Sequence, residues 1–367
     1  MSIPFYDFSK LHNKNFRDKV KKRFSEIIDN NNFVEGNYNT SFENEFAQMQ
    51  QAKHCLLVAN GTDALEISLI ASGVKQNDKV GIPGITFFAT AEAVINIGAI
   101  PVLVDVTSST GLICPESLNR IIKKHELKAI IPVHIYGLPA PILELEKICS
   151  QNNIKIIEDG AQASGTMLSS GPVGSSSNLT TFSFYPTKNL SAFGDAGAIL
   201  TQSDEMASLI KSIRNHGRGS DGLIGRNSRC DHLQAAVLHL KLETITDLNN
   251  KRKEKAKQYH QELSSLDIKL LPKKFLDSSS WHLYPILLNN KETRDGLHSY
   301  LKESSISNVI YYQKSMAQET ALSELEGEFE QSNIFSSKVL CLPIHPFIEV
   351  AEIKHITDCI KTYLENH

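Results

Sequence analysis

The stretch Thr180-Thr-Phe-Ser-Phe-Tyr-Pro-Thr-Lys-Asn-Leu-Ser-Ala-Phe-Gly-Asp-Ala-Gly-Ala-Ile-Leu200 carries the most information about this chain. It begins as an apolar, strand-like run that ends in a Tyr-Pro turn, and Lys188 follows that turn ahead of several small residues. A lysine held among aromatic and small side chains loses hydration, so the pKa of its ammonium should fall. A neutral amine attacks aldehydes, although a lysine seen in isolation is more often an ordinary surface residue.

The length, net charge and composition of the chain limit the classes of protein that need to be considered. At 367 residues the chain exceeds the usual size of one core, so we expect a large domain over residues 1–245 and a smaller one over residues 246–367. The net charge of −3 argues against a nucleic-acid partner. The chain has no apolar run of membrane-spanning length and no signal-peptide core. Six scattered cysteines predict free thiols, no metal site and a cytoplasmic protein.

Short β-branched runs alternate with helical patterns up to about Leu200, which predicts an α/β domain with a mostly parallel sheet. A polar helical pattern from Leu240 to Leu266 is the expected boundary of the second, smaller α/β part. In parallel sheets, ligands gather at the carboxyl ends of the strands. The runs that we expect to be strands are 79–82, 100–106, 129–135, 154–158 and 198–201.

The segment Asn60-Gly-Thr-Asp-Ala-Leu65 directly follows an apolar run and opens a helical pattern. The first turn of a helix exposes unpaired N–H groups and a partial positive charge, which suits a phosphate. Gly61 would allow close approach of the backbone, and Thr62 would add a hydroxyl. An ordinary capped helix start explains the same residues.

Three further features lie between this segment and Lys188. Asp159 ends an apolar strand, where a partly buried carboxylate needs a partner such as a protonated pyridine nitrogen. Gln162 could bind a hydroxyl group on the same pyridine ring. An N-cap aspartate is the alternative. Phe87 offers an aromatic face for a planar cofactor, unless it is a core residue. Ser183 is a second candidate for the phosphate.

The order of these features resembles the DegT/DnrJ/EryC1/StrS family of pyridoxal 5′-phosphate (PLP)-dependent sugar aminotransferases over nearly the whole chain. The resemblance implies the aspartate aminotransferase fold (fold type I): a large PLP domain with a mostly parallel central sheet and a smaller C-terminal α/β domain. The segments that carry it are 61–65, 86–90, 98–105, 158–163, 182–190, 194–198, 227–236 and 342–346.

The resemblance implies a role for each matching position. Lys188 would hold the cofactor as a Schiff base, Asp159 would bind its ring nitrogen, and Gln162 would bind its ring hydroxyl. Phe87 would stack on its ring. The phosphate would be bound by Gly61, Thr62, Ser183 and, from the neighbouring subunit, Asn227, so that a homodimer would be the minimal active unit.

The implied activity is transfer of an amino group from glutamate to the ketone of a nucleotide-linked deoxy sugar, for synthesis of surface polysaccharide or glycoconjugate. The segment Tyr185-Pro-Thr-Lys-Asn-Leu190 resembles the matching segment in the branch of the family that acts on 3-keto sugars. A 4-keto sugar, a cyclitol ketone and a non-catalytic regulator or scaffold remain as alternatives. Tyr185 and Arg229 are candidates for substrate contact, since arginine suits phosphate, although Arg229 could equally form a surface ion pair.

One segment departs from the family pattern. Where relatives commonly carry His-Tyr-Pro late in the smaller domain, this chain has Ile310-Tyr-Tyr-Gln-Lys-Ser-Met316, and we assign no site residue there.

The segment Gly217-Arg-Gly-Ser-Asp-Gly222 fits the dinucleotide pattern GxGxxG, but it follows a helical pattern rather than a strand. We therefore predict no NAD site.

Overall fold

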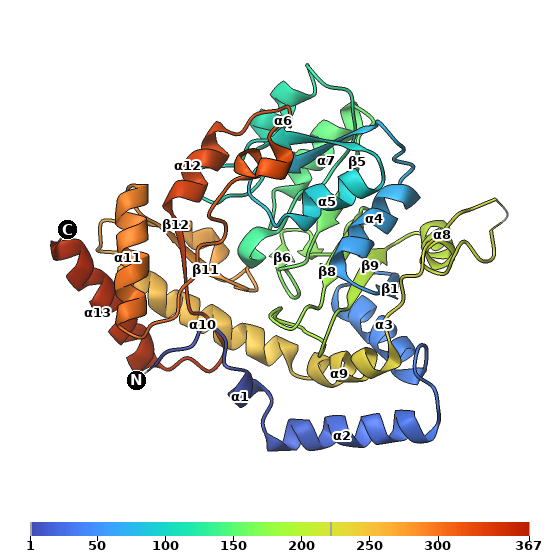
Figure 1. Cartoon of the computed structure of the whole chain (residues 1–367), viewed down its shortest axis with the longest axis horizontal. Helices are drawn as coiled ribbons and strands as arrows, with labels where there is room; N and C mark the ends of the chain where they lie inside the picture. Colours follow the sequence, from blue (N-terminus) through green and yellow to red (C-terminus); the bar gives the residue numbers. More distant parts are fainter. Residues whose placement is uncertain (1, 221, 367) are drawn as a thin grey trace.

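The computed structural model describes residues 2–220 and 222–366, and its centre is a seven-stranded sheet (Figure 1). All of its strands run parallel to one another except β9, which pairs antiparallel with both of its neighbours. This confirms the predicted α/β class and the mostly parallel sheet. In spatial order the strands are β1 (His54–Val58), β9 (Gly197–Thr201), β8 (Leu179–Ser183), β5 (Lys155–Asp159), β4 (Leu127–Ile130), β2 (Lys79–Pro83) and β3 (Ile100–Val104).

Both faces of the sheet are covered by helices, which is why its strands are apolar almost throughout. Along β3, Val102 and Val104 pack into the cluster that contains α6 and α7, whereas Leu103 packs into the cluster on the other face, with α4 and α5. The helices around the sheet are α4 (Gly61–Ala71), α5 (Ala89–Asn96), α6 (Pro115–Ile121), α7 (Ile142–Gln151) and α8 (Asp204–Arg214).

The first part of the chain lies outside these layers. In Figure 1, α2 (Lys14–Asp29) runs below α9 (His232–Leu242), and Val20 of α2 packs against Val237 and Leu240 of α9. The other N-terminal helices are α1 (Phe8–Leu11) and α3 (Asn37–Met49). The Ser/Gly-rich segment 169–178 contains one strand of a short hairpin, β6 (Met167–Leu168) with β7 (Gly171–Pro172).

The C-terminal part is a three-stranded antiparallel sheet with helices around it. The long polar helix predicted from about Leu240 to Leu266 is present as α10. Its predicted extension across Thr244 is wrong, because α9 ends at Leu242 and a turn closed by Thr244 N–H and Lys241 O separates it from α10. The elements are α10 (Ile245–Leu263), β10 (Lys269–Leu270), β11 (Tyr284–Leu287), α11 (Lys291–Glu303), α12 (Glu330–Lys338), β12 (Val339–Leu342) and α13 (Val350–Asn366).

The predicted division at residues 245 and 246 coincides with the start of α10, but two segments cross it. The N-terminal Ile3 exchanges backbone hydrogen bonds with Ser305 and Ser307, at 2.9 and 3.0 Å. Further along the first part, Leu103 of β3 exchanges backbone hydrogen bonds with Glu326 and Glu328 of the C-terminal part. The two parts are thus fastened to each other by backbone contacts. None of the helices in the described residues has the length and apolar character needed to cross a membrane.

Candidate active site

A pocket of about 400 Å³ opens at the carboxyl ends of β1, β5 and β8. These three strands are parallel, so the residues that follow them meet at one edge of the sheet. All but two of the predicted site residues line this pocket: Gly61, Thr62, Phe87, Asp159, Gln162, Ser183, Tyr185 and Lys188.

Lys188 lies on a tight turn after β8 and is partly exposed to the pocket. The turn is closed by its own N–H, which donates to the carbonyl of Tyr185 at 2.8 Å. Burial lowers the pKa of Lys188 to about 8, while the negative charge of Asp159 opposes that shift. Near neutral pH the amine is thus mostly protonated, but its neutral fraction is far larger than that of an ordinary lysine, as suits both a nucleophile and a proton carrier.

Asp159 ends β5 and is buried, with 6% of its surface exposed. One oxygen accepts from Ala161 N–H at 3.0 Å, and the other accepts from Thr90 Oγ1 at 3.3 Å. Burial nevertheless raises the pKa of Asp159, against the effect of these hydrogen bonds and of Lys188. A carboxylate in this situation gains from a cationic partner brought into the pocket.

The adjacent Glu158 does not serve the pocket. Successive side chains of a strand point to opposite faces, so Glu158 lies on the far side of β5 from Asp159. There it is fully buried, and it accepts from His134 Nε2 at 3.0 Å and from Asn178 Nδ2 at 3.0 Å. These hydrogen bonds hold the pKa of Glu158 below its ordinary value despite burial. The pair Glu158 and His134 therefore anchors the strand that presents Asp159.

One end of the pocket has the properties of an anion site. Asn60 caps α4 by accepting from Asp63 N–H at 2.8 Å, so the N–H groups of Gly61 and Thr62 have no acceptor within the helix. Ser183 lies against this turn: a Cβ on Gly61 would come within 2.7 Å of the Ser183 Cβ. Glycine is required here by the close approach of β8 and α4, which brings the Ser183 hydroxyl beside the helix start.

Gln162 is oriented by a backbone donor. Its Oε1 accepts from Tyr136 N–H at 2.6 Å, so its Nε2 is the donor, and this atom faces the hydroxyl of Tyr312 at 3.3 Å. The ring centroid of Tyr312 lies 6.3 Å from that of Phe87. Phe87 keeps 60% of its surface exposed, which is more than a core phenylalanine would.

The structure adds pocket residues that the sequence analysis missed. Tyr311 and Tyr312 come from the segment in which we assigned no site residue, and His282 comes from the turn before β11. Tyr6 reaches the pocket from the N-terminal end of the chain, where its side chain hydrogen-bonds to Thr187. None of these residues belongs to a motif that marks it, because only the folded chain brings it into the same pocket as Lys188.

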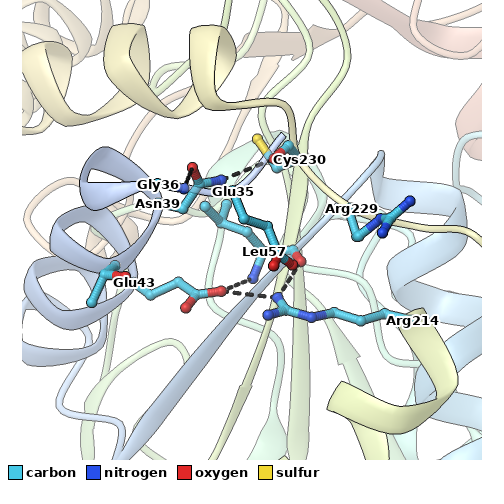
Figure 2. A pocket seen from close by; sticks show the side chains of 9 residues that line it. Glu35, Gly36, Asn39, Glu43, Leu57, Arg214, Arg229 and Cys230 are labelled. Carbon is cyan, nitrogen blue, oxygen red and sulfur yellow. Dashed lines mark hydrogen bonds and ion pairs between the residues drawn. The ribbon is translucent and has the colours of Figure 1, made fainter. Parts of the chain in front are cut away.

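Asn227 and Arg229 do not line this pocket. Arg229 lines a second cavity of about 310 Å³, where its guanidinium points away from Arg214 and Glu43 (Figure 2). It donates instead to Asn227 Oδ1 at 2.9 Å and to Asn215 Oδ1 at 3.3 Å. Backbone hydrogen bonds between 213–216 and 226–228 hold this segment at the surface. Within one chain, Arg229 therefore orients Asn227 and does not reach the predicted substrate site.

The arrangement in the pocket fits PLP. The phosphate would be held by Gly61, Thr62 and Ser183, and the ring by Asp159, whose buried carboxylate gains from a cation. Phe87 offers an exposed face, and Gln162 has a donor free for an oxygen. The amine of Lys188 has no hydrogen bond to any residue in the described ranges, so it is free to react.

Comparison with known proteins agrees with this geometry. The model of the DegT/DnrJ/EryC1/StrS aminotransferase family matches residues 14–361. The erythromycin biosynthesis sensory transduction protein EryC1 of Saccharopolyspora erythraea is 34% identical over 368 residues, which is 98% of this chain and 99% of that protein.

An enzyme relative and a solved structure are similar over the same length. The UDP-N-acetyl-3-dehydro-alpha-D-glucosamine 3-aminotransferase of Acidithiobacillus ferrooxidans is 32% identical over 367 residues, covering 99% of this chain and 98% of the enzyme. The crystal structure of S. venezuelae DesV superposes with a TM-score of 0.92 at 30% identity, covering 99% of each chain.

Proposed function

The chain belongs to the DegT/DnrJ/EryC1/StrS aminotransferase family, and from that membership we propose that it moves the amino group of glutamate to the C3 ketone of a nucleotide-linked sugar. It is a PLP-dependent sugar aminotransferase. The reaction exchanges an amine for a carbonyl: glutamate leaves as 2-oxoglutarate, and the keto sugar leaves as an amino sugar. The proposal rests above all on the presence in one pocket of Lys188, Asp159 and the start of α4.

Lys188 has the central part. Bound PLP supplies an aldehyde that condenses with primary amines and a cationic ring that withdraws electrons from the carbon next to the nitrogen. Lys188 would hold the aldehyde in the resting enzyme. When it is not attached to the cofactor, its Nζ would take the proton from Cα of glutamate in the first half of the reaction and would deliver a proton to C3 of the sugar in the second. A pKa of about 8 suits both transfers.

The other pocket residues would position the cofactor. Asp159 would keep the ring nitrogen protonated, and the N–H groups of Gly61 and Thr62, with the Ser183 hydroxyl, would bind the phosphate. Phe87 would cover one face of the ring. Each assignment uses a group that has no stronger partner within the described residues.

The substrate assignment is supported by two observations. The Acidithiobacillus relative is named for a 3-aminotransferase reaction on a UDP-linked 3-dehydro sugar. In addition, four tyrosines line the pocket, and one of them, Tyr185, is 52% exposed. Such side chains offer hydroxyl groups and flat faces to a sugar. We assign Tyr185 to substrate contact on this basis.

A homodimer is part of the proposal. Asn227 is exposed and does not line the pocket of its own chain. The neighbouring Ser228 nevertheless lies close to the phosphate-binding turn, because its Oγ accepts from Ala59 N–H at 3.1 Å. We assign Asn227 to the phosphate in the partner subunit's pocket. If so, mixing inactive Lys188→Ala chains with Asn227→Asp chains should restore about a quarter of wild-type activity at limiting PLP, because mixed dimers contain one intact pocket. No recovery in demonstrated mixed dimers would contradict the shared site.

The test of the reaction is spectroscopic. The PLP-loaded protein should lose its visible absorption band when glutamate is added, and a Lys188→Ala protein should show no such change on the same time scale. UDP- and dTDP-linked 3-keto and 4-keto sugars are then added in turn, and the 3-keto sugars should restore the band. Restoration by 4-keto sugars alone would overturn the C3 assignment, and a protein that never binds PLP would favour a regulatory role.

A further inference from the structure

His282 lines the same pocket as Lys188, yet neither the sequence motifs nor the proposed reaction gives it a role. It directly precedes β11, in a segment that is tied to the large domain by hydrogen bonds. Leu283 N–H donates to Tyr136 O, and Ser280 N–H donates to Gly137 O. Its side chain is only 4% exposed. The imidazole is therefore held rigidly in the wall of the pocket.

The hydrogen bonds of its neighbours fix which ring nitrogen carries a proton. Asn189 Nδ2 donates to the backbone carbonyl of Ser280 at 2.9 Å and to Asn249 Oδ1 at 3.0 Å. A backbone carbonyl can only accept, so the orientation of the Asn189 amide is determined, and its Oδ1 is the atom that faces His282 Nδ1 at 3.3 Å. Nδ1 of His282 must then carry the proton and donate it.

The other ring nitrogen is left as an acceptor. The charges of Lys188 and Arg252 and the burial of the ring all lower the pKa of His282 well below its ordinary value, so the imidazole is neutral. A neutral ring with a proton on Nδ1 has a lone pair on Nε2. This atom has no hydrogen bond to any residue in 2–220 or 222–366, and the ring lines the pocket.

Lys188 needs such an acceptor when it is protonated. An ammonium has three donors, and no hydrogen bond joins Nζ to another of the described residues. Asp159 is the carboxylate whose charge acts on it, but both Asp159 oxygens already accept hydrogen bonds, and the proposed function assigns this carboxylate to the cofactor ring. The phenol groups of Tyr6 and Tyr312 already take part in hydrogen bonds, with Thr187 and with Gln162 Nε2.

We propose that His282 is a positioning residue for Lys188: when the lysine is protonated and not attached to the cofactor, its side chain turns towards Nε2 of His282 and donates a hydrogen bond to it. The acceptor holds the ammonium in the pocket between taking up and delivering its proton. It also stabilises the protonated lysine, so it raises the pKa of Lys188 above the value that burial alone would give. This inference rests on the proposed function, since it assumes that Lys188 is the proton carrier.

Two variants separate the ring nitrogens. In His282→Asn, the amide can still donate to Asn189 from the position of Nδ1, but nothing replaces Nε2. In His282→Gln, the longer side chain places an amide oxygen near the position of Nε2. The measurement is the rate at which the full-length protein, freed of cofactor, captures added PLP as a function of pH, because only the neutral amine of Lys188 reacts.

We expect His282→Asn to move the midpoint of this pH profile downwards by about one pH unit, the effect of losing a hydrogen bond to a charged group. His282→Gln should return the midpoint most of the way to that of the wild type. Equal midpoints in all three proteins, or equal shifts in both variants, would overturn the inference. If the wild type captured no PLP at any pH, the proposed function itself would fail, which is a distinguishable result.

The tautomer can be read without any substitution. Nitrogen-15 NMR of the imidazole side chains, with the His282 signals assigned through their connectivity to the His282 backbone, should show a proton on Nδ1 and a bare Nε2 from pH 6 to 8. A protonated Nε2 in this range would contradict the inference even if both variants failed to fold.

Discussion

Two lysines of this protein have lowered pKa values and different surroundings. Lys188 lines the active-site pocket and has a pKa lowered to about 8. Lys241 is 6% exposed, has a pKa lowered to about 7, and does not line that pocket. Its ammonium donates to Ser191 Oγ at 2.9 Å and lies 5.2 Å from the centre of the Phe193 ring.

The difference shows that a lowered pKa does not by itself mark a reactive lysine. Lys241 is the more perturbed of the two, because its packed surroundings contain no carboxylate that opposes the cost of burial. Lys188 has a cavity in front of it and the charge of Asp159 nearby, so its neutral amine can meet another molecule. Reactivity therefore depends on access and on neighbouring groups as much as on the pKa.

Replacing each lysine in turn should give the largest contrast. Lys188→Ala should lower the transamination rate by at least about 10³-fold, because the proton carrier and the cofactor anchor are lost together. Lys241→Met should retain activity within about threefold, since it changes no pocket residue. Steady-state rates and the cofactor absorption spectrum of both purified variants test this. Loss of activity in a folded Lys241→Met protein would remove the distinction between the two sites.

Asp159→Asn tests the carboxylate that sets the two lysines apart. Without its charge the cofactor ring should withdraw electrons less well, and we expect the rate to fall by about 10²–10³-fold. The same change should lower the pKa of Lys188, because Asp159 is the charge that raises it. The pH profile of PLP capture should therefore shift to lower pH. A profile that shifts upwards would show that another group controls Lys188.

The lowered pKa of Lys241 should affect the free energy of unfolding rather than the activity. Its folded-state pKa of about 7 lies below the ordinary lysine value near 10.4, so between these pH values the unfolded chain holds a proton that the folded chain lacks. Its contribution to stability therefore rises as pH increases from 7 to 10, by an amount on the order of a few kcal/mol. Urea unfolding of wild type and Lys241→Met at pH 7 and 9.5 measures this.

The stability gained by Lys241→Met over the wild type should be largest at pH 7 and smaller at pH 9.5. Lys251→Met, at an exposed position of α10, is the matched control and should show no such difference between the two pH values. A gain that does not depend on pH would mean that Lys241 remains protonated in the folded protein.

The smallest expected effect concerns the two phenylalanines at the start of α5. Phe87 is exposed to the pocket, whereas Phe88 packs against the core cluster around α4 and α5. Phe87→Leu should weaken PLP binding by up to about tenfold, the value of one aromatic contact, and leave the melting temperature unchanged. Phe88→Leu should do the reverse. Cofactor titration and thermal unfolding of the pair check this, and a common effect on both properties would contradict it.

The sequence predicted those parts of the site that lie at strand ends. Asp159, Ser183 and the turn at Gly61 each follow an apolar run, so their meeting at one edge of a parallel sheet could be inferred before the structure was known. The extended helix predicted across Thr244 was wrong, because a short turn leaves the pattern of polar residues almost unchanged.

By itself, then, the sequence determined the fold class through its local patterns, and through its resemblance to a family it determined the cofactor and pointed to the lysine that we propose reacts. Only the tertiary structure decided that Tyr6, His282 and Tyr312 enter the pocket, and that Arg229 turns towards Asn227 instead. These contacts join residues far apart in the chain. Side-chain packing and long-range hydrogen bonds select them, and neither leaves a periodic signal in a single sequence.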